Sequence, residues 1–137
     1  MDANSDAIPA GAEPISRRVI GCAFEVSNSL GSGFLESVYE NALCMELAAR
    51  GIEFARQVVL EVRYKGQVAG SFVADLVVAR SLLVEIKAVR CFAPEHEAQV
   101  INYLRATGLH VALLMNFGSP RLQVRRLVFA HDDRQLV

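Results

Sequence analysis

Two short apolar runs joined by a three-residue turn constrain the fold of this chain more than any other part of its sequence. Leu76-Val-Val and Leu82-Leu-Val lie on either side of Ala79-Arg80-Ser81. Strands with one wet face alternate between apolar and polar residues, whereas continuously apolar strands are buried on both faces. The sequence therefore predicts a β-hairpin, with strands over residues 68–78 and 82–89, inside a sheet that is covered on both sides.

Helical periodicity occurs twice before this hairpin. Ser16 can cap a helix over residues 17–30 that ends at Gly31, and a second helix is expected to end at Gly51. Glu36 lies near the first turn of this second helix. The core-facing positions predicted for the two helices are, in chain order, Val19, Ile20, Ala23, Phe24, Leu30, Leu35, Val38, Tyr39, Ala42, Leu43 and Leu47.

Further strands and a third helix complete the pattern. Residues 58–64 alternate with period two before a Lys65-Gly66 turn, and Pro94 opens a helix that reaches Thr107. Strands are also expected over residues 110–117 and 122–129. Because a short helix joins the third and fourth strands, these should be parallel neighbours connected by a right-handed crossover. The predicted order is α-α-β-β-β-α-β-β, an α/β fold with a mixed sheet flanked by helices.

Length and composition indicate one domain. The 137 residues suffice for a single core, and 53% of them are hydrophobic. Residues 1–14 contain Asp2, Asp6 and Glu13 and no basic residue, so we expect a disordered acidic tail followed by a single domain over residues 15–137. That domain has 14 basic and 12 acidic residues, a formal charge of +2. Any phosphate binding must therefore be local rather than driven by a strong long-range field.

The expected location is the cytoplasm, with no membrane partner. No apolar run reaches the roughly 18 to 20 residues that span a bilayer, and the N-terminus lacks the layout of a signal peptide. Cys22, Cys44 and Cys91 contain no C-x-x-C pair. We expect them to be reduced packing residues rather than metal ligands.

Three charged residues interrupt the apolar hairpin. If the turn is centred on Arg80, then Asp75 and Glu85 are equidistant from it and face each other, with Cβ atoms roughly 5 Å apart. Residues two apart on a strand share a face, so Lys87 lies beside Glu85. Paired carboxylates repel unless a cation or proton separates them, and hard oxygen ligands suit Mg²⁺ or Mn²⁺. The alternative is a solvated strand face with an ordinary Glu85–Lys87 ion pair.

Four other residues are weaker candidates for this site. Glu36 adds a third carboxylate if its helix packs across the same face, and otherwise only favours the helix dipole. Gln99 and Tyr103 are four positions apart on the third helix, with His96 one turn earlier, so they share a face. A polar stripe of this kind is also typical of a solvated helix surface.

Together, these residues carry a resemblance to a known family. The segments concerned are Gly33-Phe-Leu-Glu36-Ser-Val-Tyr39, Phe72-Val-Ala-Asp75, Glu85-Ile-Lys87, His96-Glu-Ala-Gln99 with Tyr103, and Asn116-Phe-Gly118. This combination resembles the small bacterial GxxExxY family of the PD-(D/E)xK nuclease superfamily. The match covers nearly the whole chain after the acidic tail. It implies a restriction-endonuclease-like core in the order predicted above.

The resemblance also implies roles for the candidate residues. Asp75, Glu85 and the backbone carbonyl of Ile86 would bind Mg²⁺ or Mn²⁺, with Glu36 as the helical acidic ligand. Lys87 would be the lysine of the signature. The accessory residues beside the site would be His96, Gln99 and Tyr103.

The sequence departs from the family pattern at two positions. Ser27 stands where many members have His, and Val73 where Arg is frequent. The first departure removes a polar contributor and the second a phosphate contact. Neither deletes the metal-binding residues.

The function implied is metal-dependent hydrolysis of phosphodiester bonds in nucleic acid, with DNA favoured over RNA. One alternative keeps the fold as a catalytically weak or inactive module that binds nucleic acid or a protein. Another is a homodimer or scaffold that uses the sheet edge at residues 122–129. Arg121, Arg125 and Arg126 suit either phosphate contacts or solubility.

Overall fold

A computed structural model describes residues 14–130 of the chain. The predicted acidic tail lies outside the described residues apart from Pro14, as does the segment 131–137. The elements are α2 (Ile15–Leu30), α3 (Glu36–Ala49), β1 (Phe54–Tyr64), β2 (Gln67–Val78), β3 (Leu82–Lys87), α4 (Pro94–Thr107), β4 (Val111–Asn116) and β5 (Gln123–Val128). Their order is the predicted one. Among the described residues, no helix is both long enough and apolar enough to cross a membrane.

The five strands form one sheet in the order β1-β2-β3-β4-β5. Neighbouring strands are antiparallel except β3 and β4, which are parallel and are connected through α4. A parallel pair cannot be joined by a tight turn, so the helix supplies the crossover. The predicted parallel pair and the α/β class are both confirmed.

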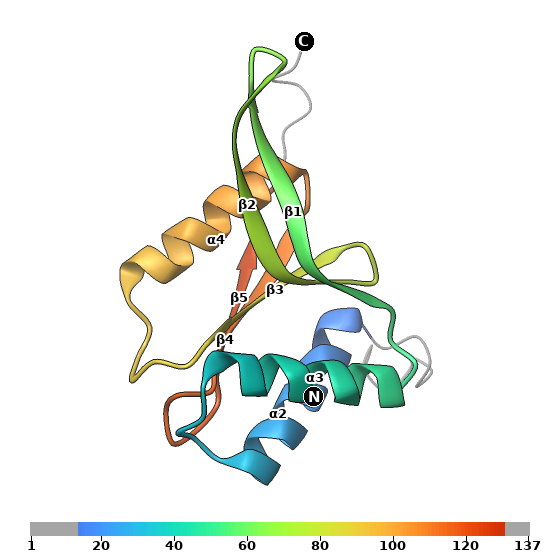
Figure 1. The fold of residues 1–137 in the computed structure, drawn as a ribbon, viewed down its shortest axis with the longest axis vertical. Helices are drawn as coiled ribbons and strands as arrows, with labels where there is room; N and C mark the ends of the chain where they lie inside the picture. The colour runs from blue at the N-terminus through green and yellow to red at the C-terminus, as the bar shows by residue number, and fades with distance from the viewer. Residues whose placement is uncertain (1–13, 131–137) are drawn as a thin grey trace, which may run out of the picture.

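Helices cover both faces of the sheet, with α2 and α3 on one side and α4 on the other (Figure 1). The larger core lies beneath α2 and α3 and includes Tyr39, Leu43, Leu76, Val84 and Met115. The smaller core lies beneath α4 and includes Ala74, Leu83, Val100, Leu104 and Leu114. Successive residues of β3 and β4 therefore enter opposite cores, which explains why these strands are apolar almost throughout.

The helices differ from the sequence-based expectations in detail. Ser16 is not a cap: α2 begins at Ile15, and Pro14 at the cap position makes no side-chain hydrogen bond. Proline has no N–H to satisfy and fixes φ near about −65°, so it can start a helix without a polar cap. Phe24 and Leu35 were expected in the core but are 46% and 77% exposed. Phe24 lies about 100° around the helix from its buried neighbour Ala23.

The β1–β2 hairpin changes face part-way along its length. Leu76 belongs to the core beneath α2 and α3, whereas Ala74, two positions earlier, belongs to the core beneath α4. Side chains two apart on a regular strand share a face. Between the flanking ladder pairs, Gln57 and Asp75 form no pair, and Gln57 has a left-handed φ of 49°. The hairpin is therefore irregular at Asp75.

The first strand is longer than predicted. β1 begins at Phe54 rather than at Val58, because the polar residues Arg56 and Gln57 interrupt the apolar alternation that indicated the strand. β3 ends at Lys87, two residues before its predicted end. Beyond the irregular step, the hairpin extends past the rest of the sheet (Figure 1).

Candidate metal centre

The β2–β3 hairpin brings Asp75 and Glu85 together. Its register is centred on Arg80, as predicted. Beyond the last ladder pair, the Asp75 amide donates a hydrogen bond to Glu85 Oε2 at 2.7 Å, and the Ile86 amide donates one to Asp75 Oδ2 at 2.8 Å. Each carboxylate thus binds the backbone of the opposite strand, and the two lie side by side.

The setting of this acidic pair disfavours its ionised form. Burial raises the pKa of Glu85 to about 7, and the neighbouring Asp75 charge also raises it, against a hydrogen bond from the Asp75 amide and the charge of Lys87. Burial likewise raises the pKa of Asp75, and the charges of Glu40 and Glu36 act in the same direction. Without a cation, the pair therefore retains a proton close to neutral pH.

The donor set of the pair fits a divalent cation. Glu85 is buried and Asp75 half-buried, and both offer hard carboxylate oxygens. Mg²⁺ is commonly bound by one or two carboxylates while it keeps several waters. Within residues 14–130, no three Asp, Glu, His or Cys side chains converge to hold a metal. Glu36 therefore stands apart from the pair, although its charge reaches Asp75.

Lys87 lies at the end of β3 and is half-buried. Its charge lowers the pKa of both Asp75 and Glu85, so it acts on both acids. The ion pairs formed within residues 14–130 do not include one between Lys87 and Glu85. The alternative of a solvated strand face with an ordinary ion pair is therefore not what this hairpin contains, since Glu85 is only 6% exposed.

Helix α4 brings Gln99 and Tyr103 to the same region. The Tyr103 ring stacks on Phe72 with 3.6 Å between ring centroids. Burial raises the pKa of Tyr103, the charges of Glu85 and Asp75 raise it further, and a hydrogen bond with Gln99 opposes them. Gln99 and Tyr103 thus interact with each other, and Tyr103 lies close enough to the acidic pair for its charges to change the pKa of the phenol.

His96 makes local contacts at the start of α4. Its Nδ1 accepts a hydrogen bond from the Ala93 amide at 3.0 Å, and its ring meets Phe92 edge-on. This bond satisfies one of the amides that a helix N-terminus leaves without a partner. These contacts explain His96 as a residue that starts the helix, and its accessory role stays a prediction.

Tyr39 fixes the loop that leads into Glu36. Its hydroxyl donates to the Gly31 carbonyl at 2.6 Å and accepts from the Phe34 amide at 3.2 Å. Its ring stacks on Phe117, with 4.8 Å between centroids. The start of α3 is thereby tied to the residue that follows β4.

The Asn116-Phe-Gly118 motif supports the segment that follows Lys87. The buried Asn116 side chain accepts hydrogen bonds from the Val89 and Gly118 amides, each at 2.9 Å. The Phe117 amide donates to the Lys87 carbonyl at 2.9 Å. A Cβ at Gly118 would come within 2.4 Å of the Val89 nitrogen, so glycine is required there. The sequence pattern identifies this motif without indicating its role.

One charged residue near the site, Glu40, is not among those predicted from the sequence. It is 8% exposed and forms an ion pair with Arg56 at 2.8 Å. It also accepts hydrogen bonds from the Gln57 side chain. Its position four residues after Glu36 places both on one face of α3, which is the sequence signal that could have identified it.

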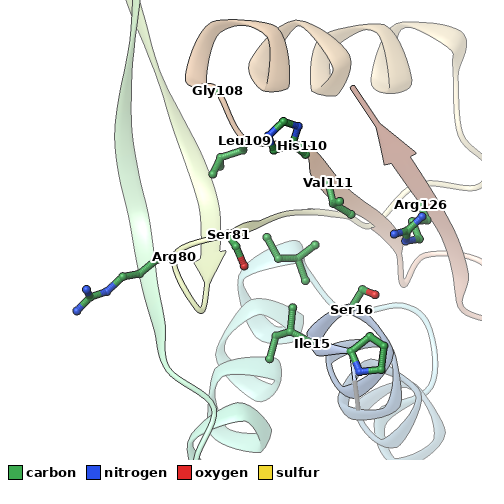
Figure 2. A pocket seen from close by; sticks show the side chains of 11 residues that line it. Ile15, Ser16, Arg80, Ser81, Gly108, Leu109, His110, Val111 and Arg126 are labelled. Atoms are coloured by element: carbon green, nitrogen blue, oxygen red, sulfur yellow. The ribbon is translucent and has the colours of Figure 1, made fainter. Parts of the chain in front are cut away.

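Two hollows on the described part of the surface lie away from Asp75 and Glu85. A pocket of about 480 Å³ lies where β3 and β4 begin. Figure 2 shows Ile15, Leu109 and Val111 around this pocket and Arg80 directed away from it. Ser27 lines another hollow, of about 650 Å³, together with Arg121. The departure at Ser27 therefore concerns a surface outside the acidic pair.

Two acidic side chains from neighbouring strands thus lie side by side in a mixed α/β sheet, with a lysine two positions after one of them. A family profile described as the PD-(D/E)XK nuclease superfamily matches residues 13–127. The chain therefore belongs to the PD-(D/E)XK nuclease superfamily. A search of curated proteins found no match.

Two solved structures share the fold. SSO0001 aligns with a TM-score of 0.55 and 19% identity over 73% of this chain and 52% of its own, so the chain spans about half of its length. An alkaline exonuclease, LHK-Exo from Laribacter hongkongensis, aligns with a TM-score of 0.50 and 14% identity over 90% of this chain and 74% of its own. At these identities the likeness concerns the fold alone. Together with the family match, it confirms the predicted restriction-endonuclease-like core.

Proposed function

We propose that this chain is a metal-dependent nuclease that hydrolyses phosphodiester bonds in nucleic acid, with DNA as the preferred substrate. The observation that carries the proposal is the side-by-side arrangement of the Asp75 and Glu85 carboxylates, with Lys87 on the same strand as Glu85. Membership of the nuclease superfamily supports nucleic acid as the substrate class, and nucleases of this superfamily generally use divalent metals.

The acidic pair would hold Mg²⁺ or Mn²⁺. Asp75 and Glu85 would provide carboxylate oxygens, the Ile86 carbonyl would add a backbone ligand, and Glu36 would contribute through water. When bound, the ion would polarise a phosphate oxygen and lower the pKa of a coordinated water. Burial of Glu85 excludes bulk solvent from one side of the site, which strengthens these electrostatic effects.

Lys87 would act through its charge rather than as a general base. Its positive charge acts on both Asp75 and Glu85, which places an ammonium group beside the acidic pair. The ammonium group therefore positions the attacking water and stabilises negative charge that develops on the phosphate. Gln99 and Tyr103 would serve as accessory residues beside it, with His96 one turn away.

Within the superfamily, the chain would belong to the GxxExxY group. Gly33 has a φ of 114°, a conformation that L side chains rarely adopt. Glu36 is the first residue of α3, and Tyr39 binds the loop that precedes it. The spacing of the motif is therefore explained by a glycine turn, an acidic helix start and an aromatic anchor.

A cleavage assay tests the proposed function. The full chain is incubated with single- and double-stranded DNA and RNA in the presence of Mg²⁺, Mn²⁺ or a chelator. Cleavage should require the metal, and Asp75→Ala should abolish it. Lys87→Ala should lower its rate by roughly 10²- to 10³-fold, as expected when one charge-stabilising group is removed. Lys65→Ala, at the exposed turn of the β1–β2 hairpin, serves as the matched control and should cleave normally.

The same set of proteins distinguishes cleavage from binding alone. A module that binds nucleic acid without cleaving it would retain a gel shift in Lys87→Ala and show no cleavage in the wild-type chain. The departures from the family pattern at Ser27 and Val73 are the observations that favour this second function. Activity that is undiminished in Asp75→Ala, or absent with every metal and substrate, would refute the catalytic assignment.

A further inference from the structure

Arg56 and Gln57 are adjacent on β1, yet both bind the carboxylate of Glu40 on α3. Arg56 Nη2 and Nε donate to Glu40 Oε2 at 2.8 and 3.2 Å. Gln57 Nε2 donates to Glu40 Oε1 at 3.0 Å and to Oε2 at 3.2 Å. Adjacent side chains on a regular strand point to opposite faces. The two can reach one carboxylate because the backbone at Gln57 is left-handed, with a φ of 49°.

Glutamine does not favour this backbone conformation. A non-glycine residue in the left-handed region costs on the order of 1 kcal/mol and persists only where the surroundings hold it. Gln57 lies inside a strand, so no turn imposes the conformation. The surroundings that hold it are Glu40, only 8% exposed, and Arg56, which compensates the Glu40 charge.

The irregular step in β1 lies across from Asp75. Ladder pairing joins the residues on either side of Gln57 to the residues on either side of Asp75 and leaves these two unpaired. Asp75 is also the position at which β2 changes face and binds the backbone of β3 instead. The left-handed conformation of Gln57 and the placement of the Asp75 carboxylate therefore belong to the same irregular step in the β1–β2 hairpin, which we call the bend.

We propose that Glu40, Arg56 and Gln57 form a clamp that holds this bend and thereby positions Asp75 to bind the divalent cation. The clamp residues are positioning residues that do not touch the metal. The clamp also joins α3, which begins with Glu36, to β1. The inference rests on the proposed function, because the cation is the one proposed for the Asp75–Glu85 pair.

Calorimetric titration of the full chain with Mn²⁺ tests the clamp without relying on activity. Two variants are compared with the wild type: Arg56→Gln, which removes the charge, and Arg56→Lys, which keeps the charge but not the forked contact. Arg50→Gln is the matched control, because it breaks an exposed ion pair between Arg50 and Glu46 of α3. Circular dichroism melts establish that each protein is folded at the temperature of the titration.

The sign of the change in Arg56→Gln separates positioning from simple electrostatics. Removal of a positive charge near a cation site would by itself lower the Kd for Mn²⁺. Loss of the clamp should raise it by about tenfold, the usual lower range when a residue that orients a metal ligand is removed. Arg56→Lys should also raise the Kd for Mn²⁺. If Arg56→Gln does not fold, the Kd of Arg56→Lys alone tests the clamp.

An unchanged or lower Kd for Mn²⁺ in both Arg56 variants would overturn the clamp while leaving the proposed function intact. Arg50→Gln should bind Mn²⁺ as the wild type does. An equal loss of affinity in this control would also overturn the clamp, because it would show that any disturbance of α3 has the same effect. Absence of Mn²⁺ binding by the wild-type chain would refute the proposed function and the clamp together.

Discussion

The amide of Asp75 donates to the Glu85 carboxylate across 2.7 Å, while the Asp75 carboxylate accepts from the amide that follows Glu85. Each acid is therefore oriented by the strand that carries the other. Groups held by rigid strands are placed more accurately than groups held on loops. The arrangement prepares two carboxylates for a shared cation, and without a cation it favours retention of a proton by the pair.

Stability without metal should fall as pH rises, because of Glu85. Its pKa is about 7 in the folded chain against an ordinary value of 4.5, so the folded state holds the proton more tightly. The resulting stabilisation is complete below the ordinary pKa and is lost as pH rises through about 7. It amounts to on the order of 3 kcal/mol. Urea denaturation in the presence of chelator, from about pH 5 to about pH 8, measures the fall in the free energy of unfolding. This fall should be smaller in Glu85→Gln than in the wild type. An equal fall in the two proteins would contradict the assignment to Glu85.

Metal binding should displace the same proton. Below the pKa of Glu85, a cation must compete with that proton, so the Kd for Mn²⁺ should rise by about tenfold for each unit by which the pH falls. Above about pH 8 the Kd should level off. Calorimetry in buffers of different ionisation enthalpy measures both the Kd and the proton released. Affinity that does not change with pH would show that Glu85 is not a ligand.

Gly118→Ala should destabilise the chain and disturb the segment after Lys87. Its Cβ would lie 2.4 Å from the Val89 nitrogen and 2.5 Å from the Ala88 carbonyl carbon, both backbone atoms that cannot turn aside. Overpacking of this kind costs about 1 to 3 kcal/mol. Gly70→Ala is the control, because a Cβ there would meet nothing within 4 Å. Denaturation curves that match for the two variants would contradict the proposed role of the motif.

Tyr39→Phe should weaken the loop before Glu36. The change removes the hydroxyl that binds the Gly31 carbonyl and the Phe34 amide, inside a residue that is fully buried. Loss of these contacts should lower the free energy of unfolding by about 1 to 2 kcal/mol. Tyr64→Phe, on a residue that is 66% exposed, should have little effect. A stable Tyr39→Phe variant would mean that the stack on Phe117 alone fixes the loop.

Most of the fold could be predicted because its signals are local. The apolar runs around Arg80 set the β2–β3 register, which the structure reproduces, and that register places Asp75 with Glu85. A helix-length connection between the third and fourth strands was enough to predict a parallel pair. These features depend on neighbours in the sequence or on the period of the side chains.

The bend at Gln57 could not be predicted, because its cause is remote in the sequence. Glutamine has no preference for a left-handed backbone, and the residue that stabilises it, Glu40, lies on a helix 17 positions earlier. Glu40 itself was omitted from the predicted site although a local signal was present, since its position four residues after Glu36 places both acids on one face of α3. Ser16 was misassigned for a different reason. Helix α2 begins at Ile15, and Pro14 at the cap position makes no side-chain hydrogen bond, so the helix starts without a polar cap.

Anomalous scattering from crystals grown with Mn²⁺ shows directly whether Asp75 and Glu85 share a cation. A single strong Mn²⁺ peak is expected between the two carboxylates, within coordination distance of an oxygen of each. The peak should be missing in crystals of Asp75→Asn. A fully occupied Mn²⁺ peak elsewhere, with none between these two carboxylates, would contradict the shared site.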